Sequence, residues 1–132
     1  LQAITMPDQR YAQYLKGCDF IQRYIFPGSC VPSLGAINEA VRQRTDLKMV
    51  DLEDIAPHYA ETLRRWRDNF NAHREDIRAL GYPERFIRLW NYYFCYCEAG
   101  FDERYLSDLQ IVLTRPKWRG EVPRRLGNGS SF

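Results

Sequence analysis

The residue types that usually form metal sites are scarce in this sequence of 132 residues. Its only histidines are His58 and His73, and no C-x-x-C pair is present. Structural zinc sites take about four histidine or cysteine ligands at close spacings, so we expect no metal centre. The four cysteines are Cys18, Cys30, Cys95 and Cys97. They are expected to be free thiols in a reducing cytoplasm.

The sequence also lacks a G-x-G-x-x-G turn and a long apolar run. Rossmann-like folds bind their nucleotide cofactor at such a turn, so we expect no cofactor-binding residue in this chain. A membrane-spanning helix needs about 20 apolar residues, and any membrane contact is therefore expected to be peripheral. The formal net charge of +2 is too small to indicate a nucleic-acid partner.

Basic residues are concentrated at the C-terminal end of the chain. Residues 115–132 carry five arginine or lysine residues against one glutamate. We expect part of a folded domain over residues 1–115 and a basic, flexible tail over 116–132. The tail is either solvated or in contact with an anionic lipid surface, where each basic residue contributes ~1 kcal/mol.

Hydrophobic periodicity predicts a helix-rich α/β fold. Strands are expected over residues 1–5, 47–52 and 109–114. Helices are expected after Pro7, over residues 18–26 and after Ser33, a natural N-cap. This order suits the second half of an α/β sheet with a helical excursion before its last strand.

Two long helices are predicted between the second and third strands. The first has a face with Leu63, Trp66, Phe70, Ile77 and Leu80, and it ends at Gly81-Tyr82-Pro83. The second has a face with Phe86, Leu89, Trp90, Tyr93, Phe94, Cys97 and Phe101. Aromatic residues make up 14% of the sequence. These faces therefore indicate either an aromatic core or an aromatic wall around an apolar or cationic ligand.

Four segments carry the most distinctive motifs. They are Tyr-Ile-Phe-Pro-Gly-Ser-Cys-Val-Pro-Ser at 24–33, Pro-His-Tyr-Ala-Glu-Thr-Leu-Arg-Arg-Trp at 57–66, Tyr-Cys-Glu-Ala-Gly-Phe at 96–101 and Leu-Gln-Ile-Val-Leu at 109–113. Taken in order, they resemble the C-terminal half of the cyclopropane-fatty-acyl-phospholipid synthase family over nearly all of residues 1–114. The resemblance implies the C-terminal part of a Rossmann-like, seven-stranded methyltransferase sheet, so the chain is expected to begin inside a domain.

The resemblance also implies a function. Members of this family transfer a methyl or methylene carbon from S-adenosylmethionine to an unsaturated acyl chain, here expected to be part of a phospholipid. We expect a cytoplasmic protein, peripheral to the inner membrane, with self-association through residues 1–5 as one possibility. The chain by itself is expected to bind the cofactor weakly and to transfer nothing. The alternative is a non-catalytic helical module that binds lipid or protein.

Two candidate catalytic residues follow from the resemblance. Tyr59 matches a tyrosine that reaches into the family's active site from the start of a long helix, where its hydroxyl would orient the catalytic base. The alternative is a tyrosine packed on the sheet. Gln2 occupies the place of a histidine that helps the family to hold bicarbonate, the proton acceptor. Gln2 cannot become a cation, which puts a bicarbonate site in doubt.

Glu98 is the third candidate catalytic residue. The better-known synthases have a small residue at this place. A carboxylate beside the aromatic face of its helix would have a raised proton affinity, as a general base near neutral pH requires. We therefore predict that Glu98 replaces bicarbonate and that Gln2 holds it by a hydrogen bond. The alternative is a helix-end glutamate paired with Arg85, Arg104 or solvent.

The Phe-Pro-Gly turn supplies the candidate substrate-binding residues. These are Tyr24, Phe26, Pro27 and Gly28. Their two aromatic rings would wall an acyl channel and shield a sulfonium by cation–π contact, or they would simply seal the core at a helix end. The first long helix carries Arg64, Arg65, Arg67 and Arg74. They belong either to a solvated face or to a surface that meets lipid phosphates.

Overall fold

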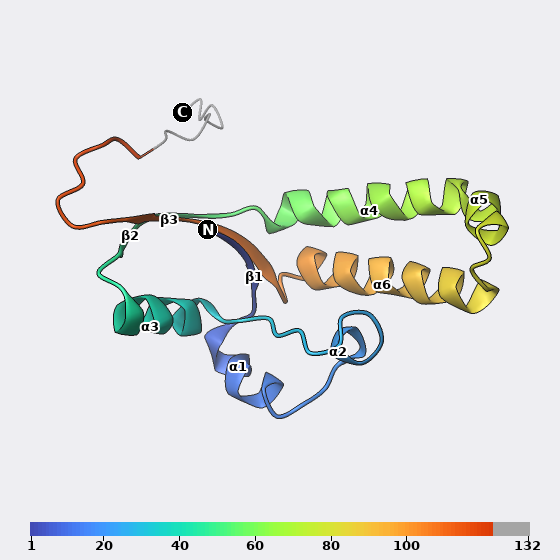
Figure 1. The fold of residues 1–132 in the computed structure, drawn as a ribbon, viewed down its shortest axis with the longest axis horizontal. Coiled ribbons are helices and arrows are strands. Elements are labelled where there is room, and N and C mark those ends of the chain that lie inside the picture. Colours follow the sequence, from blue (N-terminus) through green and yellow to red (C-terminus); the bar gives the residue numbers. More distant parts are fainter. Residues whose placement is uncertain (123–132) are drawn as a thin grey trace.

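The computed structural model describes residues 1–122, which form three strands and six helices (Figure 1). In chain order the elements are β1 (Gln2–Thr5), α1 (Asp8–Tyr14), α2 (Phe20–Tyr24), α3 (Leu34–Arg44), β2 (Lys48–Asp54), α4 (Ala56–Ala72), α5 (Arg74–Ala79), α6 (Glu84–Asp102) and β3 (Ser107–Thr114). The strands form one sheet, and α4 and α6 pack side by side as a long helical pair that extends from it (Figure 1).

The last strand lies in the middle of the sheet. The strand order is β1-β3-β2, and β3 is antiparallel to both neighbours. Its residue Asp108 pairs with Ile4 of β1, and the next residue, Leu109, pairs with Asp54 of β2. The predicted helical excursion thus leaves the sheet after β2 and returns beside it. The Ile55 N–H, just before α4, donates to the Asp108 carbonyl at 2.8 Å.

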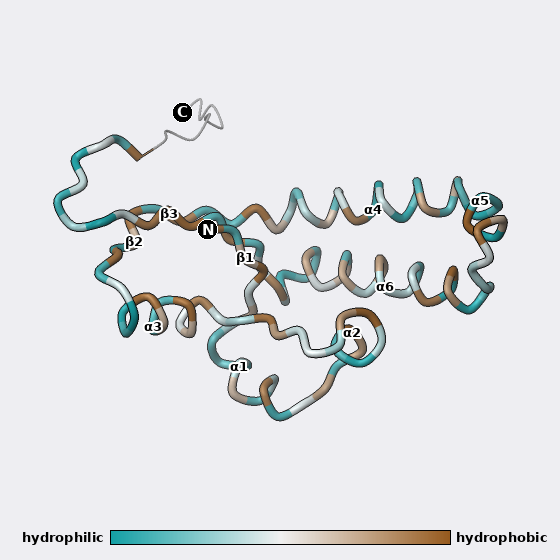
Figure 2. Tube along the Cα trace, viewed as in Figure 1, coloured by the Kyte–Doolittle hydropathy of each residue, from teal (hydrophilic) through white to brown (hydrophobic). Residues whose placement is uncertain are grey.

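The core lies between α4, α6 and the end of the sheet. Ala56, Ala60 and Leu63 of α4 pack against Phe94 and Phe101 of α6, and all five are buried. Two alanines one turn apart leave room for the large side chains of α6 to approach. Figure 2 shows apolar and polar residues alternating along both helices, as expected for helices with one buried face.

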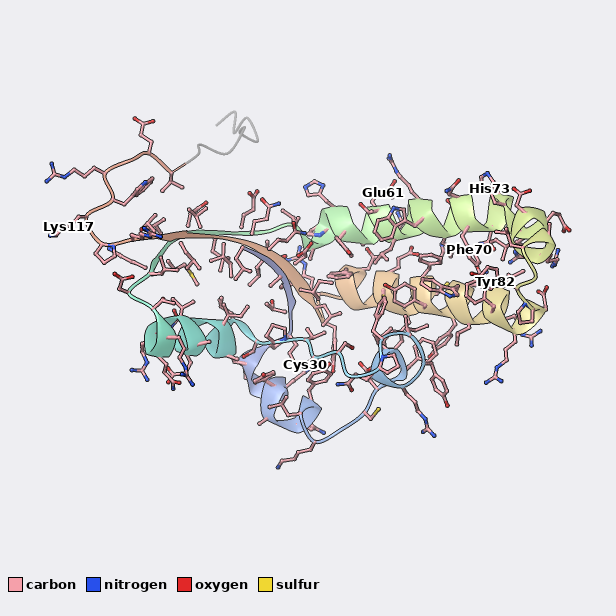
Figure 3. All side chains as sticks on the ribbon, in the orientation of Figure 1. Cys30, Glu61, Phe70, His73, Tyr82 and Lys117 are labelled. Atoms are coloured by element: carbon pink, nitrogen blue, oxygen red, sulfur yellow. The ribbon has the colours of Figure 1, made fainter. Side chains whose placement is uncertain are left out.

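The first predicted long helix is divided in two. His73 leaves helical geometry with φ −106° and ψ 24°, so α4 ends at Ala72 and α5 begins at Arg74. After the break Ile77 is still partly buried, whereas Leu80 is 76% exposed. Trp66 lies at the edge of the stripe and is 48% exposed. The prediction of one continuous face from Leu63 to Leu80 is therefore wrong beyond α4, whose Phe70 packs on Phe94 and lies toward α6 in Figure 3.

Side-chain hydrogen bonds to the backbone determine where α2 and α3 begin. Ser33 caps α3 as predicted, since its hydroxyl accepts the Ala36 N–H at 3.1 Å. Asp19 and Gln22 form a capping box at α2, which occupies only part of the predicted 18–26 helix. Gly28 follows with φ +82°, a left-handed conformation that favours glycine. The chain thus turns sharply from α2 toward β1 and α3.

The predicted basic tail is only partly described. After β3, residues 115–122 form no helix or strand. Residues 123–132, the remainder of the predicted tail, lie outside the described residues. The boundary between the domain portion and the tail at 115/116 stays a prediction.

Candidate active site

A cavity of about 540 Å³ lies where β1, α2, α4 and α6 meet. Its lining is mostly apolar and aromatic: Ile4, Met6, Ile21, Phe26, Val31, Tyr59, Leu63, Tyr93, Cys97, Phe101 and Leu106 are among its residues. Polar groups are few, and Asp19 is the carboxylate among the lining residues. A concave, apolar cavity of this size with a few polar groups is typical of a small-molecule site.

Tyr59 lines this cavity from the first turn of α4. Its backbone N–H donates to Ile55 at 3.2 Å, and its ring lies 4.9 Å from the ring of Phe101. Burial raises the pKa of Tyr59, and the nearby charge of Asp108 raises it further. The hydroxyl therefore stays protonated at neutral pH and is able to donate a hydrogen bond.

Tyr93 and Cys97 lie one turn apart on α6 and also line the cavity. Burial raises the pKa of Tyr93 to about 12. Burial also raises the pKa of the Cys97 thiol to about 11. Both groups are neutral at pH 7, so this wall of the cavity carries no charge.

These raised pKa values predict a loss of stability at alkaline pH. A group whose folded pKa lies above its ordinary value stabilises the fold fully below the ordinary value, and this stability is lost as the pH rises through the folded pKa. The ordinary value is 10.0 for Tyr93 and 9.0 for Cys97. We expect Tyr93→Phe to reduce the fall in Tm between pH 9 and 12, measured in the complete protein. The exposed Tyr82 provides the control Tyr82→Phe, and equal slopes for the two variants would contradict the assignment.

Gln2 forms its hydrogen bond with a carboxylate that the sequence did not indicate. Its Nε2 donates to Oδ2 of Asp108 at 2.8 Å. Asp108 lies on β3 and is 1% exposed. The predicted partner, Glu98, forms different contacts, so the structure does not bring Gln2 and Glu98 together.

Glu98 faces α4, and its side chain is 13% exposed. Its Oε1 accepts a hydrogen bond from Arg64 Nε at 2.9 Å. Its Oε2 lies 2.8 Å from Arg67 Nη1 in an ion pair without hydrogen-bond geometry. The expected partners Arg85 and Arg104 are thus replaced by arginines that lie 34 and 31 positions away in the sequence, brought close by the packing of α4 against α6. Glu98 is absent from the cavity lining, and its role as a base stays a prediction.

Substitution of Glu98 distinguishes a role in ion pairs with α4 from a role as the catalytic base. The ion pairs predict that Glu98→Gln lowers the Tm slightly, in a salt-dependent way, and leaves turnover unchanged. Asp102→Asn is the control, because Asp102 forms only a long, exposed contact with Arg64 at 3.5 Å. Loss of most turnover in Glu98→Gln at an unchanged Tm would instead support the role as a base.

The predicted substrate-binding turn contributes one residue to the cavity. Phe26 lines it, and its ring lies 5.9 Å from that of Tyr93. Tyr24 is half exposed and its ring contacts Phe20 in a tilted arrangement, whereas Pro27 and Gly28 shape the turn. Thus the structure brings Phe26 together with Tyr59, and the contact of the other three residues with substrate stays a prediction.

The remaining candidate groups do not form a second site. The four cysteines are free. Within residues 1–122, no group of three or more potential ligands is placed to hold a metal ion. In the same part of the chain, none of the helices is both long enough and apolar enough to cross a bilayer.

Comparison with known families identifies the relationship. A sequence profile of the mycolic acid cyclopropane synthetase family matches residues 1–111. The chain belongs to this family. It is 45% identical over 115 residues to a tuberculostearic acid methyltransferase of Mycobacterium tuberculosis, covering 87% of this chain and 27% of that protein. It is 33% identical over 96 residues to the cyclopropane-fatty-acyl-phospholipid synthase of Escherichia coli K12, covering 73% of this chain and 24% of that protein.

Solved structures agree with this assignment. A mycolic acid cyclopropane synthase crystallised with S-adenosylhomocysteine and the detergent CTAB has a TM-score of 0.73 and 25% identity, covering 86% of this chain and 42% of that chain. The α/β methyltransferase fold expected from the sequence is therefore confirmed. The chain spans about a quarter of the length of the curated relatives described above.

Proposed function

We propose that the complete protein carrying this chain transfers a methyl or methylene carbon from S-adenosylmethionine to the double bond of an unsaturated acyl chain. The cavity, which is lined mostly by apolar and aromatic side chains, supports this proposal most directly. An acyl chain needs such a surface, because transfer of apolar area from water is favourable by about 25 cal/mol per Å². The names of the relatives agree with a lipid substrate.

The chain supplies the acyl side of the site in this proposal. S-adenosylmethionine, when bound, supplies the methyl carbon. Residues 1–122 contain no glycine-rich turn between a strand and a helix that would hold such a cofactor. The residues described here therefore fit the substrate, and we assign none of them to the cofactor.

The cavity wall would protect the reacting carbon atoms. Methyl transfer to an alkene leaves a positive charge on the adjacent carbon atom, and water would capture that cation. Phe26, Tyr93 and Phe101 present rings and no charged group, so they exclude water and their faces attract the positive charge. Loss of a proton then closes a cyclopropane ring or leaves a methylated alkene.

Tyr59 would orient the acceptor of that proton. Its hydroxyl is protonated at neutral pH, because its pKa is raised by burial and by Asp108. It is therefore suited to donate a hydrogen bond to an oxygen base. That base is either bicarbonate or a carboxylate of the protein, and stimulation of turnover by added bicarbonate in bicarbonate-free buffer would identify the first.

The acyl chain would come from a phospholipid at the membrane surface. Arg115, Lys117 and Arg119 follow β3 and are exposed. Exposed cations would contact anionic headgroups at the membrane surface without insertion. Sedimentation of the complete protein with anionic but not with zwitterionic vesicles would support this contact.

Isotope transfer tests the proposed activity. The complete protein is incubated with methyl-labelled S-adenosylmethionine and vesicles of either an oleoyl or a stearoyl phospholipid. We expect labelled lipid only with the oleoyl chain, because the saturated chain has no double bond to attack. Binding of the oleoyl lipid without label transfer would support the alternative, a lipid-binding module.

A further inference from the structure

Asp108 is a carboxylate where a strand would ordinarily bury an apolar side chain. It lies in the central strand β3 and is 1% exposed. Its register partner is Ile4, which lines the cavity. Directly paired residues of antiparallel strands share one face of the sheet, so Asp108 lies on the cavity side. Burial of a charged group is costly unless its contacts compensate for the lost water.

The hydrogen bond from Gln2 to Asp108 determines the orientation of the side-chain amide of Gln2. Gln2 lies two positions before Ile4, hence on the same face of β1. A carboxylate oxygen only accepts hydrogen bonds, so the contact at 2.8 Å requires the amide nitrogen of Gln2 to face Asp108 Oδ2. The amide oxygen of Gln2 must then point away from Asp108. Asp108 thereby determines which end of the amide is offered to the site.

The second carboxylate oxygen of Asp108 is able to accept a further hydrogen bond. Oδ1 is buried and has no hydrogen-bond partner among the described residues. A buried acceptor without a donor costs free energy comparable to a lost hydrogen bond. Such an atom is seldom retained for stability alone, and an unpartnered oxygen beside a reaction site is available to a polar group of the site.

The backbone of Asp108 is held against the start of α4, which carries Tyr59. The Asp108 N–H donates to Asp54 Oδ1 at 3.2 Å, and the same oxygen accepts the Ala56 N–H at 3.0 Å. The Asp108 carbonyl accepts the Ile55 N–H at 2.8 Å. These contacts join the start of β3 to the first turn of α4. One backbone contact and the Asp54 carboxylate therefore hold Asp108 next to the first turn of α4, which carries Tyr59.

We propose that Asp108 is a positioning residue of the active site, which orients Gln2 close to the cavity that Tyr59 lines. The proposal rests on the proposed function. In this arrangement Gln2 offers a carbonyl oxygen, Tyr59 offers a hydroxyl hydrogen, and Asp108 touches neither the acyl chain nor the cofactor. The carboxylate that works with Gln2 is thus Asp108.

Four variants of the complete protein test this role. Gln2→Ala and Asp108→Ala are each expected to lower kcat about tenfold, with little change in KM, the effect of losing one charge-assisted hydrogen bond. Because Asp108 acts through Gln2, the double variant should also lose about tenfold rather than about a hundredfold. Gln110→Ala is the control for disturbance of the sheet, because Gln110 is exposed on the same strand and pairs with Gln2 in register. Its kcat should be unchanged.

The Asp108→Asn variant provides a second test that holds even if Asp108→Ala does not fold. Asparagine keeps the shape and one acceptor but removes the charge. The charge of Asp108 contributes to the raised pKa of Tyr59, so the alkaline limb of the activity profile should shift to lower pH in this variant. Wild-type kcat and an unshifted limb in Asp108→Asn would overturn the proposal. A hundredfold loss in the double variant would overturn it as well.

One readout does not depend on activity. In nitrogen-15 spectra of the complete protein, the side-chain amide protons of Gln2 should exchange slowly with solvent, and Asp108→Ala should make them exchange rapidly. Rapid exchange already in the wild type would overturn the orientation of Gln2 by Asp108. An inactive wild-type protein with slow exchange would contradict the proposed function and leave the Asp108–Gln2 contact supported.

Discussion

Replacement of Phe101 by alanine is expected to lower the free energy of unfolding of the complete protein by about 3–5 kcal/mol. Phe101 is 3% exposed and packs against the buried residues of α4. Its ring also contacts Tyr59, with 4.9 Å between ring centroids. Alanine would remove the whole ring from the cluster that it forms with the buried residues of α4, which removes these contacts and leaves a void. Denaturant unfolding measures the change.

A second aromatic residue of the same helix provides the control. Tyr92 is 54% exposed, and Tyr92→Ala removes a similar ring while leaving the core intact. We expect it to cost less than about 1 kcal/mol, as is usual for surface substitutions. Equal losses for the two variants would show that α6 is not buried through its Phe101 face.

Replacement of Tyr59 by phenylalanine is expected to lower turnover about tenfold to a hundredfold, with a nearly unchanged Tm. Removal of one hydrogen bond that acts at the reaction site costs ~1–3 kcal/mol, and each 1.4 kcal/mol corresponds to about a factor of ten in rate. The ring of Tyr59 keeps its contacts with Phe101 and Trp66 in this variant, so the fold should be retained. Steady-state kinetics with an unsaturated phospholipid measure kcat and KM separately.

The matched control for Tyr59→Phe is the same substitution at a surface tyrosine. Tyr82→Phe removes the hydroxyl of a half-exposed tyrosine that stacks on Phe86, away from the cavity. It should leave both turnover and Tm unchanged. A Tyr59→Phe variant with wild-type turnover and a lowered Tm would show that the hydroxyl of Tyr59 is structural.

Local patterns in the sequence were sufficient for most of the fold. Alternation predicted the second strand within a few residues of β2. The third predicted strand, at 109–114, lies within β3, and the stripe from Phe86 to Phe101 predicted α6. The break at His73 could not be predicted, because no proline or glycine marks it. Helical spacing therefore continued through the break to Leu80, which the structure exposes.

The candidate site was less predictable than the fold, because it depends on contacts across long sequence distances. Tyr59 and Phe26 were found by resemblance, and both line the cavity. Asp108 was missed, since an aspartate after a serine at the start of a strand resembles an ordinary strand-end residue. Only the register of β1 against β3 brings it to Gln2, 106 positions away. The one signal that could have identified Asp108 is its burial as a polar residue on an apolar face of the sheet, which only the structure shows.

The contacts of Glu98 were also not predictable from the sequence. Its position beside an aromatic stripe suggested a desolvated base, but the stripe and the glutamate face different neighbours. The antiparallel packing of α4 and α6 places Arg64 and Arg67 beside it. The structure thus pairs Glu98 with two arginines of α4, and its role as a base stays a prediction.

The proposed function requires that the cavity between β1, α2, α4 and α6 holds the reacting acyl chain. Photo-crosslinking tests this directly, with a phospholipid whose unsaturated acyl chain carries a diazirine, the complete protein and peptide mass spectrometry. We expect labels within residues 20–31 and 93–106, on wall residues such as Phe26 and Phe101, that disappear when excess oleoyl phospholipid competes. Labels confined within this chain to residues 34–54, on α3 and β2, would contradict it.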